Sequence, residues 1–200
     1  MEDVSNYIEH SLSKKKAGEI LFISDFRGIG AETAIRKTLS RLTQKGRLRR
    51  LAQGIYYIPK TDPELGELLP SAEQVAQKVA DKEKVRIYPT GVYALNRLGL
   101  STQVPMKLVY LTDGVPRLLT IGKMKVRFKA TTPKKLALKG EISRLVILAL
   151  EELDTKQQDP ERDKKLRSLL QQEDPRKLKH DLQLAPGRIY DYIVKLLNKP

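Results

Sequence analysis

The residues whose types and spacing could do chemistry lie between Thr33 and Gln53, and they are hydrogen-bond donors rather than nucleophiles. Residues 31–45 have a helical pattern whose inner face holds Ala31, Ile35, Thr38, Leu39 and Leu42. The opposite face carries Glu32 and six donors: Thr33, Arg36, Lys37, Ser40, Arg41 and Gln44. Long or forked donors can reach base edges in the major groove and the phosphates that border it, and short hydroxyl groups can contact either the bases or the phosphates. This face is therefore predicted to contact duplex DNA, with Glu32 turned away from phosphate or accepting a hydrogen bond from a cytosine.

A second group of donors follows in a predicted β-hairpin. Two β-prone runs, 47–52 and 55–58, flank a two-residue turn of Gln53 and Gly54. Leu48 and Leu51 are expected to pack inward, which leaves three arginines to reach phosphates: Arg47, Arg49 and Arg50. Gln53, at the tip of the hairpin, is expected to enter the minor groove.

The elements that must position these residues precede them in the chain. Residues 4–12 have helical spacing, residues 20–23 form a short apolar run, and Ser24 or Asp25 can cap a short helix before 31–45. Helix, strand, helix, turn, helix and hairpin is the order of a winged helix-turn-helix, whose third helix enters the major groove. A solvated basic helix is the alternative reading of 31–45 alone, but a basic strand at wing spacing favours DNA binding.

Charge gives independent support for a polyanionic partner. The net charge is +14. Residues 84–139 alone carry 12 Lys and Arg against one Asp or Glu. A field of this sign attracts nucleic acid, although solubility is the plainer explanation of a basic chain.

The basic middle segment has its own predicted surface. If 107–111 and 125–128 are strands, side-chain alternation puts Lys125, Arg127 and Lys129 on one face, with Lys134 and Lys135 following directly. Two interpretations carry equal weight. One is a second nucleic-acid surface that extends the DNA contact or binds RNA, and the other is a solvated sheet face.

Catalytic, metal and membrane chemistry find no support in the sequence. There is no cysteine, and the two histidines, His10 and His180, have no acidic cluster beside them in sequence. Gly28 and Gly30 lack the rest of a dinucleotide-binding fingerprint, and no Walker-type phosphate loop is present. The sequence therefore predicts no enzyme, no cofactor and no metal. No apolar run approaches the roughly 18 residues of a membrane span, and the N-terminus does not resemble a signal peptide, so a cytoplasmic location is expected.

The predicted organisation is α+β in two parts. Residues 1–60 form the winged helix-turn-helix, and the acidic, proline-bearing stretch 61–70 is a linker. Residues 71–200 form a mixed α/β domain that ends in helices. A capping-box pattern at Ser71 and Gln74 predicts the start of its first helix.

Several short motifs carry a family resemblance. The segments are Ser24-Asp25-Phe26, residues 34–42 (AIRKTLSRL), residues 45–51 (KGRLRRL) and residues 54–59 (GIYYIP). Further on come residues 91–95 (GVYAL) and 98–105 (LGLSTQVP). Together they resemble the AbiEi-type antitoxins, transcriptional regulators of type IV toxin–antitoxin systems, over about residues 1–135. The ending Gly-Ile-Tyr-Tyr-x-Pro is the most specific piece.

The resemblance implies a function that the residues alone do not. It implies repression of the protein's own operon through inverted repeats in double-stranded DNA, with a possible homodimer on the DNA. It also implies neutralisation of a nucleotidyltransferase-like toxin without a stable complex. Two alternatives stay open: an RNA-binding or general nucleic-acid-binding protein with a winged-helix docking module, and a protein-interaction adaptor.

Overall fold

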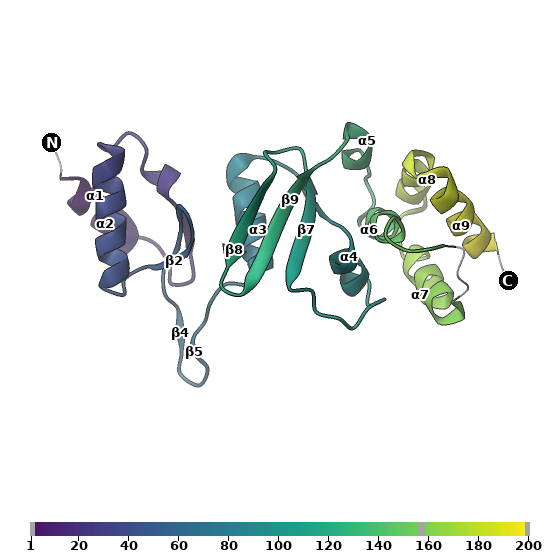
Figure 1. The fold of residues 1–200 in the computed structure, drawn as a ribbon, viewed down its shortest axis with the longest axis horizontal. Helices are drawn as coiled ribbons and strands as arrows, with labels where there is room; N and C mark the ends of the chain where they lie inside the picture. The colour runs from purple at the N-terminus through teal and green to yellow at the C-terminus, as the bar shows by residue number, and fades with distance from the viewer. Residues whose placement is uncertain (1–2, 156–158, 199–200) are drawn as a thin grey trace. The chain divides into compact units, whose positions relative to one another are not determined.

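The computed structural model describes residues 3–155 and 159–198 and shows a mixed α+β protein, which confirms the predicted class. The chain divides into two compact units (Figure 1). Of the described residues, the N-terminal unit contains 3–78 with 119–123, and the C-terminal unit contains 79–118 with 124–155 and 159–198. No helix in the described ranges is both long and apolar enough to cross a membrane.

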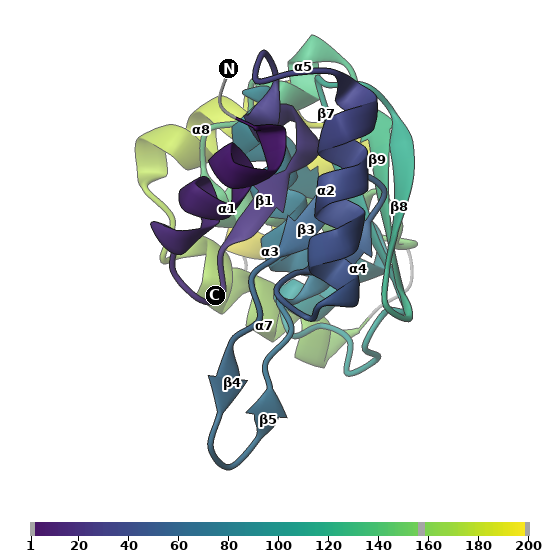
Figure 2. The ribbon, with the colours of Figure 1, turned by 90° about the vertical axis from the view of Figure 1, so that its left-hand side faces the viewer.

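The N-terminal unit begins with helices around a small sheet. Its elements are α1 (Val4–Ser13), β1 (Ile20–Phe22), the 3-10 helix η1 (Ile23–Phe26), α2 (Glu32–Gln44), β2 (Arg49–Ala52) and β3 (Ile55–Tyr57). The three strands are antiparallel in the order β1-β3-β2, and Figure 2 shows α1 and α2 with β1 and β3. The short helix predicted after Ser24 is a single 3-10 turn, because Arg27 is already extended and Gly28, which follows it, has a positive φ of 86°.

One apolar cluster joins these elements. It is built from residues of α1, β1, η1, α2, the turn after α2 and β3: Ile8, Leu12, Leu21, Phe26, Ile35, Leu39, Leu42, Leu48 and Tyr56. Leu48 is fully buried, as the hairpin pattern predicts. Leu51 is only half-buried, because the β2–β3 register shifts between Arg50 and Ala52 and leaves Leu51 outside the regular pairing. The cluster fixes α2 by its inner face and leaves its outer face free.

The stretch predicted as a linker contains a second hairpin, formed by β4 (Thr61–Asp62) and β5 (Gly66–Glu67). The Asp62 carboxylate accepts hydrogen bonds from the backbone N–H groups of Glu64 and Leu65, at 2.9 and 3.0 Å, which closes the turn. The Tyr57 hydroxyl donates to the carbonyl of Leu68 and ties the hairpin base to β3. Local hydrogen bonds therefore hold residues 61–68 in a hairpin. The acidic, proline-bearing composition predicted only a linker there.

The remaining elements start with α3 (Ala72–Glu83), whose predicted capping box between Ser71 and Gln74 is present. A four-stranded sheet has the order β6-β7-β9-β8. Its strands are β6 (Ile87–Pro89), β7 (Lys107–Thr112), β8 (Arg117–Ile121) and β9 (Met124–Ala130). β6 pairs antiparallel with β7, and β7 pairs parallel with β9. The helices are α4 (Val92–Arg97), α5 (Pro133–Leu136), α6 (Glu141–Leu150), α7 (Pro160–Leu170), α8 (Pro175–Leu184) and α9 (Gly187–Asn198).

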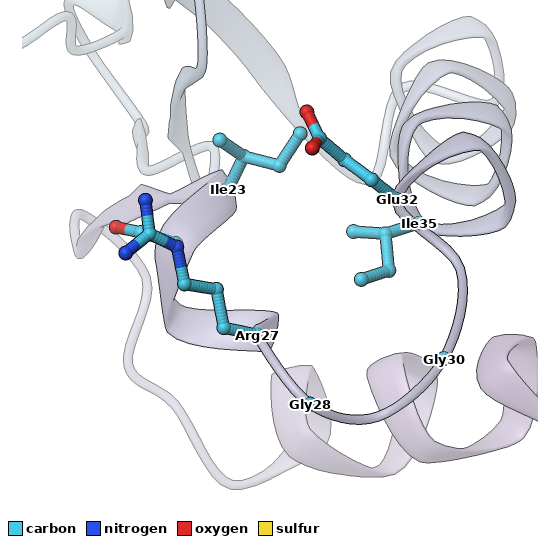
Figure 3. Close-up of a pocket in the computed structure, with 7 residues that line it drawn as sticks. Ile23, Arg27, Gly28, Gly30, Glu32 and Ile35 are labelled. Atoms are coloured by element: carbon cyan, nitrogen blue, oxygen red, sulfur yellow. The ribbon is translucent and has the colours of Figure 1, made fainter.

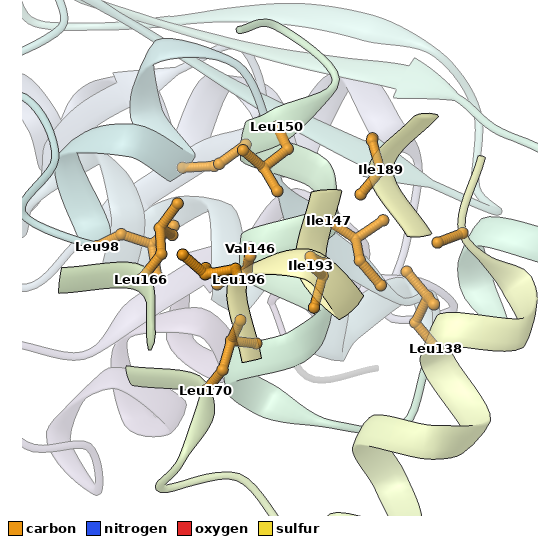
Figure 4. Packing of buried hydrophobic residues seen from close by; sticks show 13 residues of the cluster. Leu98, Leu138, Val146, Ile147, Leu150, Leu166, Leu170, Ile189, Ile193 and Leu196 are labelled. Atoms are coloured by element: carbon orange, nitrogen blue, oxygen red, sulfur yellow. The ribbon is translucent and has the colours of Figure 1, made fainter. Parts of the chain in front are cut away.

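The C-terminal helices share a core of their own (Figure 4). α6 is its centre, because five consecutive residues from Val146 to Leu150 are buried. Leu98, which follows α4, and residues of α7 and α9 pack on it, among them Leu166, Leu170, Ile189, Ile193 and Leu196. Each Å2 of apolar surface that is removed from water contributes roughly 25 cal/mol to the free energy of unfolding. Burial of these side chains is therefore the main stabilisation of the helical part.

A buried carboxylate from α8 binds the start of α6. Asp181 has no exposed surface and accepts hydrogen bonds from the backbone N–H groups of Lys139 and Gly140, both at 2.8 Å, and from the Ser143 hydroxyl at 2.6 Å. His180 Nδ1 lies 2.9 Å from the same carboxylate. Burial by itself would raise the pKa of Asp181, but the hydrogen bonds from Ser143, His180, Lys139 and Gly140 together lower it below its ordinary value.

Glu173 completes this arrangement. One of its oxygens accepts from the backbone N–H groups of Ile142 and Ser143, at 2.8 and 3.0 Å. The first N–H groups of a helix have no partner inside the helix, and negative charge is favoured there. The space is tight, because a Cβ atom on Gly140 would lie 2.0 Å from Ser143 Oγ and 2.5 Å from Glu173 Oε2.

This network predicts a pH dependence of stability. The pKa of Asp181 is lower in the folded state than in the unfolded chain. Its contribution to the free energy of unfolding is therefore fully present above the unfolded pKa of about 3.9 and is lost as pH falls through the folded pKa. Urea unfolding at a series of pH values from neutral down should show this loss below about pH 4. The loss should be smaller in Asp181→Asn, and an identical pH profile in the two proteins would count against this assignment.

Candidate nucleic-acid interface

The outer face of α2 is exposed along its whole length. Each residue predicted for this face is classed as exposed: Glu32, Thr33, Arg36, Lys37, Ser40, Arg41 and Gln44. Thr33, Lys37, Ser40 and Gln44 follow one another at intervals of four, three and four residues, so they form one stripe along the helix. This stripe lies opposite the buried side of α2. It is the part of the helix that could enter a groove most deeply.

Lys37 is the cation of this stripe. Its side chain makes no hydrogen bond or ion pair with any residue in the described part of the chain. Arg36 differs, because its guanidinium binds Glu32 one turn earlier, with Arg36 Nε 2.9 Å from Glu32 Oε1. Glu32 thus has a partner that the sequence analysis did not assign to it. Because both side chains are more than half exposed, this pair is a weak one.

The hairpin arginines lie on opposite faces of the sheet. Arg50 pairs with Tyr56, which belongs to the core beneath α2, whereas Arg49 pairs with Tyr57. Directly opposed residues of antiparallel strands point to the same face. Arg50 is therefore on the α2 side of the sheet and is exposed because β2 is an edge strand, and its guanidinium has no hydrogen-bond or ion-pair partner among the described residues.

Arg49 is engaged within the N-terminal unit. Its Nε and Nη2 atoms form a fork on the carboxylate of Glu67 in β5, at 2.8 and 2.9 Å. Hydrogen bonding to Arg49 holds the pKa of Glu67 below its ordinary value. Of the three arginines predicted to reach phosphates, Arg49 is thus bound to Glu67 and Arg47 is bound to Glu9, whereas the guanidinium of Arg50 has no partner among the described residues. Gln53 is exposed at the hairpin turn, as predicted.

A small pocket opens at the start of α2 (Figure 3). It has a volume of ≈ 150 Å3 and is lined by residues of η1, the glycine turn and the first turns of α2. Arg27 and Glu32 flank it in Figure 3. The side chain of Arg27 is exposed and has no partner among the residues described, so it is a further cation near the α2 N-terminus. Arg27 was not among the predicted site residues, although a lone arginine directly before Gly28 and Gly30 was a usable signal.

The second basic surface lies on the β7–β9 pair. Along β9, exposed Lys125, Arg127 and Lys129 alternate with buried Val126 and Phe128. In the parallel register Lys107 stands beside Lys125, so Lys107 joins this face although the prediction left it out. Lys134, in α5, is also exposed. Lys135 is not a free cation of this surface, because its ammonium binds the Glu151 carboxylate at 2.5 Å. That pairing joins residues distant in sequence and had no local signal.

The described residues give no support for a metal site. Between residues 3 and 155 and between 159 and 198, no three or more His, Asp or Glu side chains gather as a metal would need. His180, one of the two histidines, contacts Asp181 in the α6 network.

Comparisons with known proteins bear on family and fold. A model of a family of unknown function matches residues 7–178. Among solved structures, the crystal structure of the RV2827C protein from Mycobacterium tuberculosis is similar, with a TM-score of 0.50 and 14% sequence identity. The similarity covers 98% of this chain and 76% of that chain, and at this identity it concerns the fold alone. A search of curated proteins finds no match.

Proposed function

We propose that this chain, which belongs to DUF6088, a family of unknown function, is a transcriptional regulator that binds duplex DNA through α2 and the β2–β3 hairpin. The observation that carries the proposal is the exposed stripe of Thr33, Lys37, Ser40 and Gln44, whose only cation has no partner in the described chain. The order helix, strand, 3-10 helix, helix and hairpin supports it, because a winged helix-turn-helix has the same order.

The stripe suits base readout better than a mixed set of charges would. Glutamine can bind adenine with two hydrogen bonds, lysine can bind guanine, and hydroxyl groups accept or donate at several bases. Arg50 and Arg27 lie beyond the stripe and suit phosphates, which fix the position of a protein on DNA but do not specify sequence. The proposal therefore separates Lys37 and Gln44, which specify, from Arg50 and Arg27, which position.

A titration tests the proposal. Fluorescence anisotropy is measured with three labelled probes: the promoter duplex upstream of the protein's own gene, a random-sequence duplex and an RNA of equal length. We expect the promoter duplex to bind most tightly. With about six phosphate contacts, the plot of log K against log salt concentration should have a slope near −5. A slope near zero on all three probes would contradict nucleic-acid binding and favour a protein-interaction adaptor.

We further propose that the regulator is an autoregulating antitoxin of a type IV toxin–antitoxin system. This part rests on the resemblance of residues 34–59 and 91–105 to AbiEi-type antitoxins. It represses its own operon through inverted repeats, as a homodimer or as two cooperating copies, and it counteracts a nucleotidyltransferase-like toxin without a stable complex. A reporter under its own promoter should be repressed when the protein is expressed. Co-expression with a neighbouring nucleotidyltransferase-like gene should restore the growth of cells that the toxin inhibits, and the two proteins should not co-purify. If neither repression nor restored growth is found, only the proposal of DNA binding remains.

The basic face of β7 and β9 favours a second candidate, a general nucleic-acid-binding protein. Lys107, Lys125, Arg127 and Lys129 offer four exposed cations on one sheet face. Tyr88, the described aromatic residue of β6 on this face, has its ring 4.1 Å from the guanidinium of Arg144, so stacking on bases is blocked there. Contacts would then be to phosphates, without sequence preference. Equal affinity for the promoter duplex, the random duplex and the RNA would favour this candidate.

A further inference from the structure

A single carboxylate from α1 binds two arginines beside the reading stripe. Glu9 Oε1 lies 3.3 Å from Nη2 of Arg41 in α2, and Glu9 Oε2 lies 3.0 Å from Nη1 of Arg47 in the turn that follows. The Ser5 hydroxyl contacts both Arg41 and Glu9. One turn of α2 separates Arg41 from Lys37, so this cluster borders the stripe.

The cluster has the composition of a phosphate site. Two guanidinium groups and a hydroxyl converge on one acidic group, and their net charge with Glu9 included is still positive. Guanidinium forks bind carboxylates and phosphates with the same planar geometry. Both arginine side chains are 47% exposed, so an anion from solution can reach them.

We propose that Glu9 holds the place of a DNA phosphate and is exchanged for it on binding. The proposal rests on the proposed function, since it takes duplex DNA as the ligand. In the free protein Glu9 keeps Arg41 and Arg47 together and partly neutralised. On DNA the two arginines transfer to a backbone phosphate at the flank of the groove, and Glu9 returns to solvent. Glu9 thereby lowers affinity for every sequence and leaves discrimination to the stripe.

Glu9→Gln tests this exchange, and Glu19→Gln is its matched control. Glu19 lies in the same unit, is almost equally exposed at 38% against 37%, and pairs with Lys15 instead of with an arginine of α2. Both substitutions remove one negative charge, so they change the net charge equally. We expect Glu9→Gln to bind a random-sequence duplex about two- to fivefold more tightly than Glu19→Gln, which is the range of an exposed ion pair. The gain should vanish when Arg41 and Arg47 are also replaced by alanine.

A second measurement separates this proposal from the proposed function. On phosphocellulose, which presents phosphate without DNA, Glu9→Gln should elute at higher salt than Glu19→Gln. If this difference is found but no variant binds DNA, the phosphate site stands and the proposed function falls. If Glu9→Gln binds more weakly than Glu19→Gln or equally, or if the gain survives removal of both arginines, the exchange is overturned.

Discussion

Lys37→Ala is expected to weaken binding to the promoter duplex by about 1–3 kcal/mol, or about 5- to 150-fold. Lys37 stands in the middle of the α2 stripe and has no partner among the described residues, so no internal ion pair would compensate for its loss. A base contact made by such a residue contributes to discrimination as well as affinity. The substitution should therefore reduce the preference for the promoter duplex over the random duplex, measured by anisotropy with both probes.

Two comparison variants make this result specific to Lys37. Lys16→Ala removes an exposed lysine in the loop after α1, and it should change the two affinities little and equally. Arg36→Ala should cost less than Lys37→Ala, because Arg36 lies beside the stripe of Thr33, Lys37, Ser40 and Gln44 and not on it. If Arg36→Ala shifts base preference and Lys37→Ala weakens all sequences alike, the assignment of the reading residue within α2 is wrong.

Asp181→Asn is expected to lower the free energy of unfolding by about 2–3 kcal/mol. Every group around Asp181 donates or can donate: the N–H groups of Lys139 and Gly140, the Ser143 hydroxyl and His180. A carboxamide offers one oxygen and one NH2 group, so at least one buried donor would face another donor. Thermal unfolding should show a midpoint lowered by about 4–12 °C, which circular dichroism can measure.

Asp174→Asn is the matched control for this prediction. Asp174 also caps a helix, since its carboxylate accepts from Arg176 and Lys177 at the start of α8, but it is exposed. Asparagine is as good as aspartate at such a position, so its unfolding midpoint should hardly change. An equal decrease of the unfolding midpoint in the two variants would show that burial of the Asp181 carboxylate does not make it more important for stability than an exposed helix cap.

Periodicity was enough to predict which side of α2 faces outward. Ile35, Leu39 and Leu42 recur at helical spacing, and burying them leaves only one orientation for Lys37 and Gln44. Alternation likewise predicted the exposed side chains of β9. Both patterns are local, because the geometry of one element decides them.

The partners of the arginines could not be predicted in this way. Arg41 and Arg47 meet Glu9 from more than 30 residues away, and Arg49 meets Glu67 across a turn that composition suggested was a linker. No spacing rule links residues that only tertiary packing brings together. The sequence therefore predicted which cations are exposed but could not distinguish the unpaired from the paired ones.

Strand order in the four-stranded sheet has a consequence for synthesis of the chain. β9 lies between β7 and β8, although it is the last of the three to be made. While only residues up to β8 have emerged from the ribosome, β8 lacks β9, the strand that it pairs with. One edge of β7 is then also unpaired. The sheet can close only after Ala130 has left the exit tunnel, so a nascent chain stalled before that point exposes strand edges that chaperones recognise and that favour aggregation.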